Sequence, residues 1–386
     1  MRIAQAVFGV FHHFELAREL ERRGHLQRVY STWPWSRLKR EGLPHNKVET
    51  FPWIHVPEYL LARAGVDWPW ASDGLGYANA LAFDRWTAGR IGDCDALIAI
   101  SGAGLLTGRK LQERGGVFIC DRGSTHQRYQ EMVVAEEFAR WGVERAVSDE
   151  RDTLREEAIY AQADAITVPS HAAARSFAAM GVTMAKVSVI PYGVRLENFY
   201  PVVEPATDSF EVLFAGSVTL RKGFPYLLQA FAALRHPHKR LRVAGAVGPE
   251  MKGVLGRLPL EGVEFLGNLP QERLRELMSS SHVLVLPSIE EGLALVQAQA
   301  LACGCPIICS TNTGGEDLFT DGVEGFIVPI RDPAALTHAM QLLADSPDRL
   351  QLMRTAAFQR VKSIGGWSEY GDRWEQLLQR LTGASI

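Results

Sequence analysis

The chain of 386 residues has no long hydrophobic run, no surplus of one charge and few cysteines. No apolar stretch approaches the roughly 18 residues that a membrane-spanning helix needs, which excludes that class of protein. The 41 Lys and Arg residues nearly match the 44 Asp and Glu residues, so the composition gives no reason to expect nucleic acid as a partner. The five cysteines are odd in number and include no zinc-type CxxC pair, which favours reduced thiols in the cytosol.

The start of the chain has no signal-peptide pattern, because Met1 and Arg2 lead directly into a predicted strand and an amphipathic helix. We therefore expect a cytoplasmic protein. Residues 33–40 and Trp53 place tryptophans beside Arg and Lys residues in the first half of the chain. Such a surface could make peripheral contact with the inner face of a membrane or stack on sugar rings, while core packing explains the same aromatics.

Short apolar runs alternate with helical stretches along the chain, a pattern typical of parallel sheets with crossover helices. One series of strands runs from residues 3–7 to 187–190, and a second begins at 212–214; one of the helices is predicted over 136–161. The polar, proline-containing stretch 196–210 indicates an interdomain linker. The sequence thus predicts an α/β protein with two Rossmann-like, doubly wound domains, residues 1–200 and 201–365, facing each other across a ligand-binding cleft.

Residues 290–317 are the most informative segment of the chain. Glu291 and Gly292 follow a predicted strand, and a helix is expected to begin near Ala294. Unpaired N–H groups at such a helix start, together with the helix dipole, form an anion site. A carboxylate beside a phosphate site can accept hydrogen bonds from hydroxyl groups. This combination predicts a sugar nucleotide as the ligand.

Residues 214–223 predict the same kind of ligand. A strand ends at Gly216, and a short loop then leads through Arg221 and Lys222 into a helix. The glycine lets the backbone approach a phosphate, and the two cations supply positive charge where a diphosphate would leave. A solvated basic turn between a strand and a helix is the alternative interpretation.

Both segments resemble the signature of family 4 glycosyltransferases, which are retaining enzymes of the GT-B fold. The first matches the pattern Glu-Gly-Phe-Gly-Leu-Val-x-x-Glu-Ala-x-Ala-x-Gly-x-Pro at Glu291, Gly292, Leu295, Val296, Ala300, Ala302, Gly304 and Pro306. The second places the lysine of the family's Gly-Arg-x-x-x-x-Lys-Gly pattern at Lys222. The chain departs from these patterns where Leu293 and Ala294 replace Phe-Gly, Gln299 replaces the second glutamate and Ser217 replaces the arginine.

The resemblance implies a site for a nucleoside-diphosphate sugar in the second domain. It implies that Lys222 and Arg221 stabilise the leaving diphosphate, that Glu291 holds sugar hydroxyls and that Gln299 holds the ribose. The predicted donor-binding residues are Gly9, Gly216, Ser217, Arg221, Lys222, Gly292, Leu293, Ala294, Leu295 and Gln299. No metal or other cofactor is expected, because protein cations and a helix dipole take its place.

The first domain resembles the family more weakly. Gly9 matches the second glycine of the family's Gly-Gly turn, and His13 matches the histidine four residues further on. His126 follows a predicted strand and resembles a family histidine near the reacting sugar. A tight turn at Gly9 and a structural hydrogen bond at His126 are the alternatives.

The predicted catalytic residues are therefore His126, Glu291 and Lys222. On the acceptor side the sequence suggests His13, Asp121 and Arg122, although a local salt bridge explains the last two as well.

Together these features predict a retaining, metal-independent glycosyltransferase with a saccharide or a lipid-linked acceptor, in cell-surface polysaccharide or glycolipid synthesis. The resemblance also implies that a C-terminal helix within residues 366–386 crosses back to the first domain. The departures at Ser217, Ala294 and Gln299 leave a weakened or regulatory subunit as an alternative. A sugar-nucleotide epimerase or a phosphorylase on the same fold is another.

Two other patterns are rejected as functional sites. Asp93, Cys94 and Asp95 have the DxD form of a metal and nucleotide site, but they precede a predicted strand instead of following it. Glycines 102, 104 and 108 imitate a dinucleotide fingerprint, but the spacing to the third glycine is one residue too long.

Overall fold

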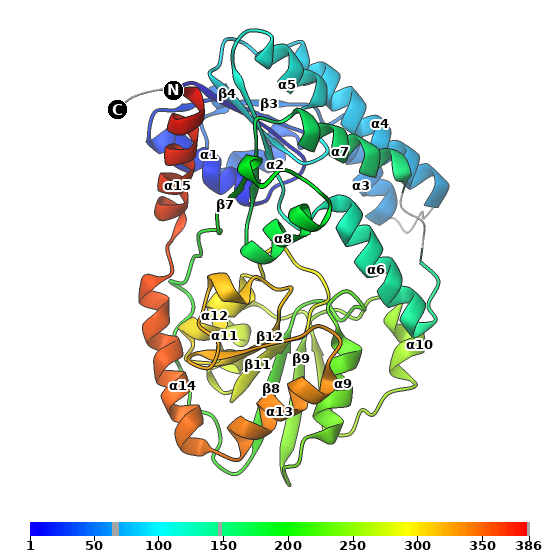
Figure 1. Ribbon diagram of the computed structural model, residues 1–386, viewed down its shortest axis with the longest axis vertical. Helices are drawn as coiled ribbons and strands as arrows, with labels where there is room; N and C mark the ends of the chain where they lie inside the picture. The colour runs from blue at the N-terminus through cyan, green and yellow to red at the C-terminus, as the bar shows by residue number, and fades with distance from the viewer. Residues whose placement is uncertain (64–68, 146–148, 384–386) are drawn as a thin grey trace.

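The computed structural model describes residues 1–63, 69–145 and 149–383, which form two α/β domains stacked along the long axis of the molecule (Figure 1). Each domain is built on one parallel sheet. The first sheet has the strand order β3-β2-β1-β4-β5-β6-β7, and the second has the order β10-β9-β8-β11-β12-β13. In both sheets the order reverses beside the strand that begins the domain, as in doubly wound nucleotide-binding folds. The predicted α/β fold with two such domains is confirmed.

The strands are short and mostly buried, as expected where helices cover both faces of a sheet. The first sheet contains β1 (Ile3–Val7), β2 (Leu26–Ser31), β3 (Val48–Thr50), β4 (Ala96–Ile100), β5 (Val117–Asp121), β6 (Ala165–Val168) and β7 (Val187–Val189). The second contains β8 (Phe210–Ala215), β9 (Lys239–Ala244), β10 (Val263–Gly267), β11 (Val283–Leu286), β12 (Ile307–Ser310) and β13 (Gly325–Val328).

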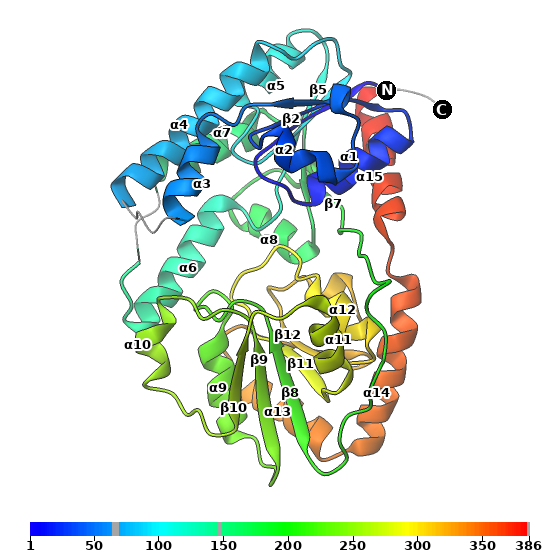
Figure 2. The ribbon, with the colours of Figure 1, turned by 180° about the vertical axis from the view of Figure 1, so that it is seen from behind.

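Helices flank both sheets (Figures 1 and 2). Those of the first domain are α1 (His12–Arg22), α2 (Trp35–Leu38), α3 (His55–Arg63), α4 (Pro69–Ala88), α5 (Leu105–Gln112), α6 (Gln127–Trp141), α7 (Glu150–Gln162) and α8 (His171–Ala179). The others are α9 (Phe224–Ala233), α10 (Met251–Leu255), α11 (Gln271–Ser279), α12 (Val296–Ala302), α13 (Pro333–Ala344), α14 (Pro347–Arg360) and α15 (Trp367–Thr382). Within the described ranges, no helix is both long enough and apolar enough to cross a membrane.

One predicted helix is two helices in the structure. The sequence suggested a single helix over 136–161, but α6 ends at Trp141 and α7 begins at Glu150. Gly142 adopts a left-handed conformation with φ of 63° directly after α6. Such a residue closes the last turn and directs the chain away from the helix axis, which ends α6.

The last helix returns to the first domain. α14 lies along the second domain, and α15 lies against α1 of the first domain (Figure 1). Tyr370, Trp374 and Leu378 of α15 are buried in the same core cluster as Ile3 and Leu16. The amphipathic repeat of α15 therefore completes the core of the first domain rather than that of the second.

The chain passes between the domains twice, and the two passages touch. The first follows β7 and the second precedes α15. The backbone N–H of Val194 donates to the carbonyl of Gly365 at 3.4 Å. A Cβ on Gly193 would lie 2.5 Å from the carbonyl oxygen of Gly366, so only glycine permits this approach.

On the opposite edge, α6 reaches from the first domain to the second beside α10 (Figures 1 and 2). Arg331 donates to the Glu137 carboxylate at 2.7 Å and also pairs with Glu136 at 3.0 Å. Arg257 donates to the Trp141 carbonyl at 2.8 Å. These contacts hold the two domains together at the side away from the two chain passages.

Candidate active site

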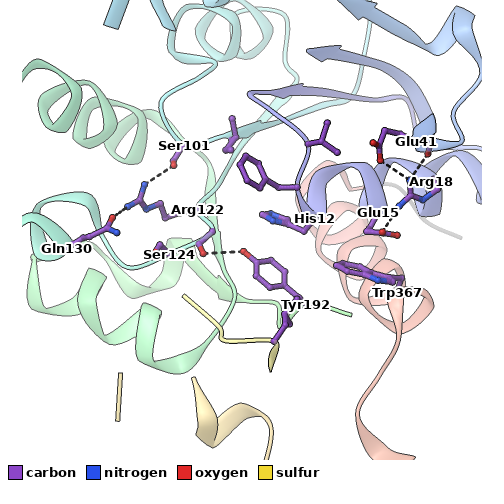
Figure 3. Close-up of a pocket in the computed structure, with 15 residues that line it drawn as sticks. His12, Glu15, Arg18, Glu41, Ser101, Arg122, Ser124, Gln130, Tyr192 and Trp367 are labelled. Atoms are coloured by element: carbon purple, nitrogen blue, oxygen red, sulfur yellow. Dashed lines mark hydrogen bonds and ion pairs between the residues drawn. The ribbon is translucent and has the colours of Figure 1, made fainter. Parts of the chain in front are cut away.

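A cavity of about 740 Å³ lies at the carboxyl edge of the first sheet (Figure 3). Leu295 of the second domain contributes to its lining. This is where doubly wound folds place their ligands. Its walls come from the loop after β1, the start of α1, the ends of β4 and β5, the segment after β7, and the start of α15. The lining residues are Val10, Phe11, His12, Glu15, Arg18, Glu41, Ile100, Ser101, Arg122, Gly123, Ser124, Gln130, Tyr192, Leu295 and Trp367.

Two histidines share one carboxylate beneath this cavity. The Nε2 atom of His12 lies 2.9 Å from Oδ2 of Asp121, and Nε2 of His13 lies 3.1 Å from the same oxygen. Thr167 donates its hydroxyl to the other oxygen at 2.8 Å. Burial opposes ionisation of Asp121, but the two histidines hold its pKa well below the usual range. The carboxylate can therefore only accept, so His12 carries its proton on Nε2.

The cavity-facing histidine is thus His12, whereas the sequence pointed to His13. His13 is almost fully buried, and burial, with a smaller effect from His12, lowers its pKa to about 4. His12 lines the cavity with its ring 4.4 Å from that of Tyr192. Its Nδ1 atom has no hydrogen-bond partner among the residues described. His12 therefore lies on the cavity wall, and His13 contacts the same carboxylate from within the core.

Asp121, His12 and His13 are also the group best suited to a metal ion. Within the described part of the chain, one ligand atom from each lies within 4.8 Å of the others. Two imidazoles and one carboxylate suit zinc or another divalent transition metal.

Arg122 is buried and its donors all have protein partners. Nε donates to the Thr125 carbonyl at 2.8 Å, and Nη1 donates to both oxygens of Glu156 at 3.1 Å. The remaining bonds run to Ser101, Gln127 and Gln130. Burial opposes the charge, but Glu156 raises the pKa of Arg122 above its usual value. Arg122 therefore organises the loop after β5 and has no N–H group left for an anion.

His126 does not face the cleft, so that expectation is wrong. Its Nδ1 accepts a hydrogen bond from the backbone N–H of Arg128 at 3.2 Å and caps α6. Its ring packs between Tyr160 and Phe177, with centroids 4.9 and 5.0 Å away, and lines a separate surface cavity. The alternative interpretation, a structural hydrogen-bonding role, describes the residue correctly.

On the second domain, the two predicted cations meet two consecutive carboxylates. Lys222 makes a short ion pair with Glu291, and Arg221 lies 3.6 Å from the same carboxylate. Arg221 also pairs with Glu290 at 3.2 Å. Burial, with the neighbouring charge of Arg221, lowers the pKa of Lys222 to about 8, so the ammonium remains mostly protonated at neutral pH. Opposite charges thus gather where the motifs predict a diphosphate.

Glu290, which the sequence did not single out, connects the two domains. Its fully buried carboxylate accepts bonds from the hydroxyls of Ser124 at 2.6 Å and Thr125 at 2.7 Å, and from the amide of Gln130 at 3.0 Å. Burial alone would raise the pKa of Glu290, yet these hydroxyls and Arg221 lower it. One carboxylate therefore links the loop after β5 to the predicted diphosphate site.

The motif glycine also sets how closely the domains approach. A Cβ on Gly292 would lie 2.1 Å from the carbonyl oxygen of Gly123 in the first domain. The carbonyl of Gly292 accepts from the Ser170 hydroxyl at 2.5 Å, and this hydroxyl also caps α8. A larger residue at Gly292 would push the domains apart.

The backbone after Gly292 differs from the predicted anion site. α12 begins at Val296, two residues later than expected, and spans seven residues. The N–H of Ala294 donates to the Thr313 carbonyl at 3.2 Å and is not free for a phosphate. Leu293 is buried. The helix start therefore offers fewer free donors than the pattern suggested, and the cations of the β8–α9 loop carry most of the positive charge.

The remaining predicted donor residues surround this cluster. Gly216 has φ of 150° and lies under the Lys222 side chain, whereas Ser217 is exposed. Gln299 is half-buried, and its side chain has no hydrogen-bond partner in the part of the chain described. Gly9 has φ of 69° in the turn that leads to the cavity wall at Val10.

Several cavity residues were not predicted from the sequence: His12, Glu15, Arg18, Glu41, Tyr192 and Trp367. They lie on segments far apart in the chain, and no local pattern unites them. The histidine pair that begins three residues after Gly9 was the one available signal, because a residue at the start of a helix after a strand faces the sheet edge.

Two family models match successive parts of the chain. The model described as "Glycosyltransferase Family 4" matches residues 10–198, and the one described as "Glycosyl transferases group 1" matches residues 197–360. The chain belongs to glycosyltransferase family 4. Together the matches cover both domains of this family 4 protein and meet at the segment between β7 and β8.

Curated relatives of the family 4 protein match over part of their length. D-inositol 3-phosphate glycosyltransferase 1 of Catenulispora acidiphila is 30% identical over 243 residues, which cover 56% of this chain and 57% of that protein. Glycogen synthase of Mycobacterium tuberculosis is 29% identical over 194 residues, covering 48% and 47% respectively. The chain thus spans about half the length of the curated relatives it matches.

Solved structures show the same fold over the whole chain. Sucrose-phosphate synthase from Thermosynechococcus elongatus has a TM-score of 0.70 and 22% identity, with complete coverage of both chains. HepE of Anabaena, solved in complex with UDP-glucose, has a TM-score of 0.66 and 15% identity, covering 98% of this chain and all of the other. The family 4 protein therefore has the GT-B fold.

Proposed function

We propose that this family 4 protein transfers a sugar from a nucleoside-diphosphate sugar to an acceptor hydroxyl, with retention of the anomeric configuration. The observation that carries the proposal is the cluster of Arg221 and Lys222 with Glu291, next to the loop that closes the cavity. Cations and a carboxylate at one point suit a ligand that has both a diphosphate and hydroxyl groups.

The cluster contains both cations and a carboxylate, and a change of ion-pair partners on donor binding would give each of them a role. In the structure, the Glu291 carboxylate pairs with the Lys222 ammonium. A diphosphate would take over Lys222 and Arg221, because it offers more negative charge than one carboxylate. The Glu291 carboxylate would then be free to accept bonds from the sugar hydroxyls, and Gln299 would contact the ribose.

The reaction needs charge stabilisation more than proton abstraction by the protein. The acceptor oxygen attacks the anomeric carbon, and the bond from that carbon to the diphosphate oxygen breaks. Front-face attack keeps the configuration, and the acceptor proton passes to the departing diphosphate oxygen. Lys222 and Arg221 would stabilise the charge on that leaving group, so we propose that no metal ion is required for this step.

The first test is thermal stabilisation of the purified protein by UDP, GDP, ADP, dTDP and their common sugar conjugates, without added metal. UDP comes first, because HepE was solved with UDP-glucose. A ligand at about 100 times its Kd stabilises a protein by about 2.7 kcal/mol, which shifts the melting temperature measurably. Stabilisation by one nucleotide class supports the donor site and names the base.

The departures at Ser217, Ala294 and Gln299 favour one rival, a subunit that no longer catalyses transfer. Such a subunit would show no stabilisation by any nucleotide in this panel. It could also bind a nucleotide sugar without releasing the nucleoside diphosphate in the presence of acceptors. Either result would replace the proposed activity by a structural or regulatory role.

We also propose peripheral membrane contact through the first domain. Trp53 is 75% exposed, and Leu60 of α3 is 56% exposed. Trp33 packs against Tyr59 of α3. Arg40, which follows in the same stretch of the sequence, is exposed. Co-sedimentation with vesicles containing anionic lipid, compared with a Trp53→Ser and Leu60→Ser variant, tests this contact. Equal binding of both proteins would contradict it.

A further inference from the structure

Asp121 is a buried carboxylate without a lysine or arginine partner. It is 4% exposed, and its side-chain partners are His12, His13 and the hydroxyl of Thr167. Among the residues that the structure describes, no Lys or Arg side chain forms an ion pair with it. Buried charges in proteins are normally paired with an opposite charge or coordinate a metal ion. A cation bound beside Asp121 would therefore balance its charge.

His13 has ring nitrogens that no protein group uses. Its side chain is almost fully buried, yet neither Nδ1 nor Nε2 forms a hydrogen bond with any described residue. Nε2 lies 3.1 Å from Oδ2 of Asp121, so this contact fails as a hydrogen bond through its direction and not through its length. Two atoms that bind one metal ion lie at such a distance with their lone pairs directed at the ion instead of at each other. The position of His13 is that of a ligand.

The spacing of the three side chains also fits a metal ion. His12 and His13 begin α1, and Asp121 ends β5. Successive residues of a helix point about 100° apart, yet both imidazoles reach the same carboxylate oxygen, at 2.9 and 3.1 Å. The ligands of a tetrahedral zinc ion, with bonds of about 2.0–2.1 Å, lie about 3.3 Å from one another. The cluster already has nearly this spacing.

A hydroxyl group holds the carboxylate in place. Thr167 donates to Oδ1 of Asp121 at 2.8 Å, so Oδ2 is the oxygen that both histidines contact. Outer partners of this kind orient the ligands of metal sites. Among the three side chains of the cluster, that of His12 is the most exposed, at 12%, and His12 lines the cavity. An ion and its water would therefore enter from the cavity.

We propose that His12, His13 and Asp121 bind one divalent transition-metal ion of the zinc class, with the fourth coordination position open to the cavity. The ion takes the Nε2 lone pairs of both histidines and one from Oδ2. His12 then carries its proton on Nδ1, because the ion replaces the proton that Nε2 donates to Asp121. Imidazole nitrogens favour zinc or cobalt over magnesium or calcium, which prefer oxygen ligands.

The site is independent of the proposed sugar transfer. All three ligands belong to the first domain, and none is assigned to the diphosphate. The ion would join the start of α1 to the end of β5, so it should stabilise the folded chain. The departure of the diphosphate would still depend on Lys222 and Arg221.

Thermal unfolding and calorimetry test the site. The protein is prepared without a histidine tag, freed of metal with EDTA, and then mixed with zinc or magnesium. We expect calorimetry to show one tightly bound zinc ion per chain. Zinc should raise the melting temperature, since it binds the folded chain in preference to the unfolded one, and magnesium should not. Cobalt in place of zinc should give the visible absorption of a tetrahedral site.

Substitutions in the cluster locate the ion. His13→Phe keeps a ring in the core and removes one ligand, whereas Asp121→Asn removes the charge. Each should weaken zinc binding by at least about 100-fold, because the loss of an outer partner alone costs about 10–100-fold. Thr167→Val removes such an outer partner and should weaken binding about tenfold. Cooperative unfolding of each variant without metal shows that it folds.

A surface pair of histidines provides the matched control. His236 and His238 flank a proline outside the cluster, and His238 is exposed. His238→Gln removes one imidazole from this pair and should leave zinc affinity and the rise in melting temperature unaltered.

Three results would overturn the proposal. The first is the absence of tight zinc binding to the unaltered protein. The second is zinc affinity that His13→Phe retains, which decides the matter even where Asp121→Asn does not fold. The third is equal stabilisation by magnesium. None of these measurements uses a donor or an acceptor, so their outcome is separate from that of the proposed transfer.

Discussion

The two domains share a strand order but offer different chemistry to a ligand. At the edge of the second sheet, Arg221 and Lys222 pair with the carboxylates of the neighbouring loop, including Glu291. At the edge of the first sheet, Arg18 pairs with Glu15 and Glu41, and aromatic rings such as Trp367 line the cavity. The two carboxylates also pair with Arg195 and Arg37. The first arrangement suits exchange with an anion, and the second combines ion-paired carboxylates with aromatic surface. One architecture therefore presents two different surfaces through the residues at its strand ends.

The largest expected effect comes from the carboxylate of the second domain. Glu291→Ala should reduce sugar transfer by at least about a hundredfold, because the sugar of the donor loses a charged partner that acts in the transition state. Release of the nucleoside diphosphate from the donor in the presence of saccharide acceptors is followed by mass spectrometry. Glu276→Ala, on the exposed face of α11, is the matched control. Unaltered transfer by Glu291→Ala would remove this residue from the site.

Lys222→Ala should weaken nucleoside-diphosphate binding by about 10- to 100-fold, since a hydrogen bond to a charged group contributes about 1.5–3 kcal/mol. Calorimetry measures the change. Lys252→Ala in α10 also removes one ammonium group and should leave the affinity as it was. If both variants bind equally well, the diphosphate does not lie beside Lys222.

A residue of the first domain should affect the other substrate. His12→Ala removes a polar ring from the cavity wall and should raise the KM for the acceptor about three- to tenfold, the range of one ordinary hydrogen bond. The Kd for the nucleotide should stay the same. A change in nucleotide affinity as large as that in acceptor KM would contradict the assignment of the acceptor to the first domain and the nucleotide to the second.

The smallest effect on catalysis is expected at His126. His126→Asn keeps an oxygen that can cap α6 but loses ring packing against Tyr160 and Phe177. Turnover should be preserved. The free energy of unfolding should fall by about 1–3 kcal/mol, because the smaller side chain leaves a cavity. Thermal unfolding and initial rates separate the two effects. A loss of turnover comparable to that of Glu291→Ala would return His126 to the catalytic residues.

The strands of the fold and the donor motifs could be predicted because each depends on residues within one continuous segment of the sequence. Buried parallel strands need unbroken apolar runs, and these recur at intervals that leave room for helices. Lys222 and Glu291 each lie in a short pattern after such a strand. Their pairing in space follows from β8 and β11 being neighbours in the sheet.

The acceptor side could not be predicted in the same way. Its lining comes from residues as distant as Glu15, Tyr192 and Trp367, which only the folded chain brings together. Sequence position also could not show that His126 turns back to cap a helix. Nor could it show that Glu290, rather than its neighbour Glu291, faces the first domain.

The paired chain passages at Gly193 and Gly366 have a consequence for motion. The two domains can separate by a hinge rotation about these two chain passages. The gap then grows with distance from the pivot, so the contact between Arg257 and Trp141 should break first. Distance measurements between spin labels on α6 and α10, with and without nucleotide, would detect this swing. Tyr192 and Trp367 lie next to the pivot and would hardly move. Such a swing would leave these first-domain walls in place and would move Leu295 of the second domain away from them.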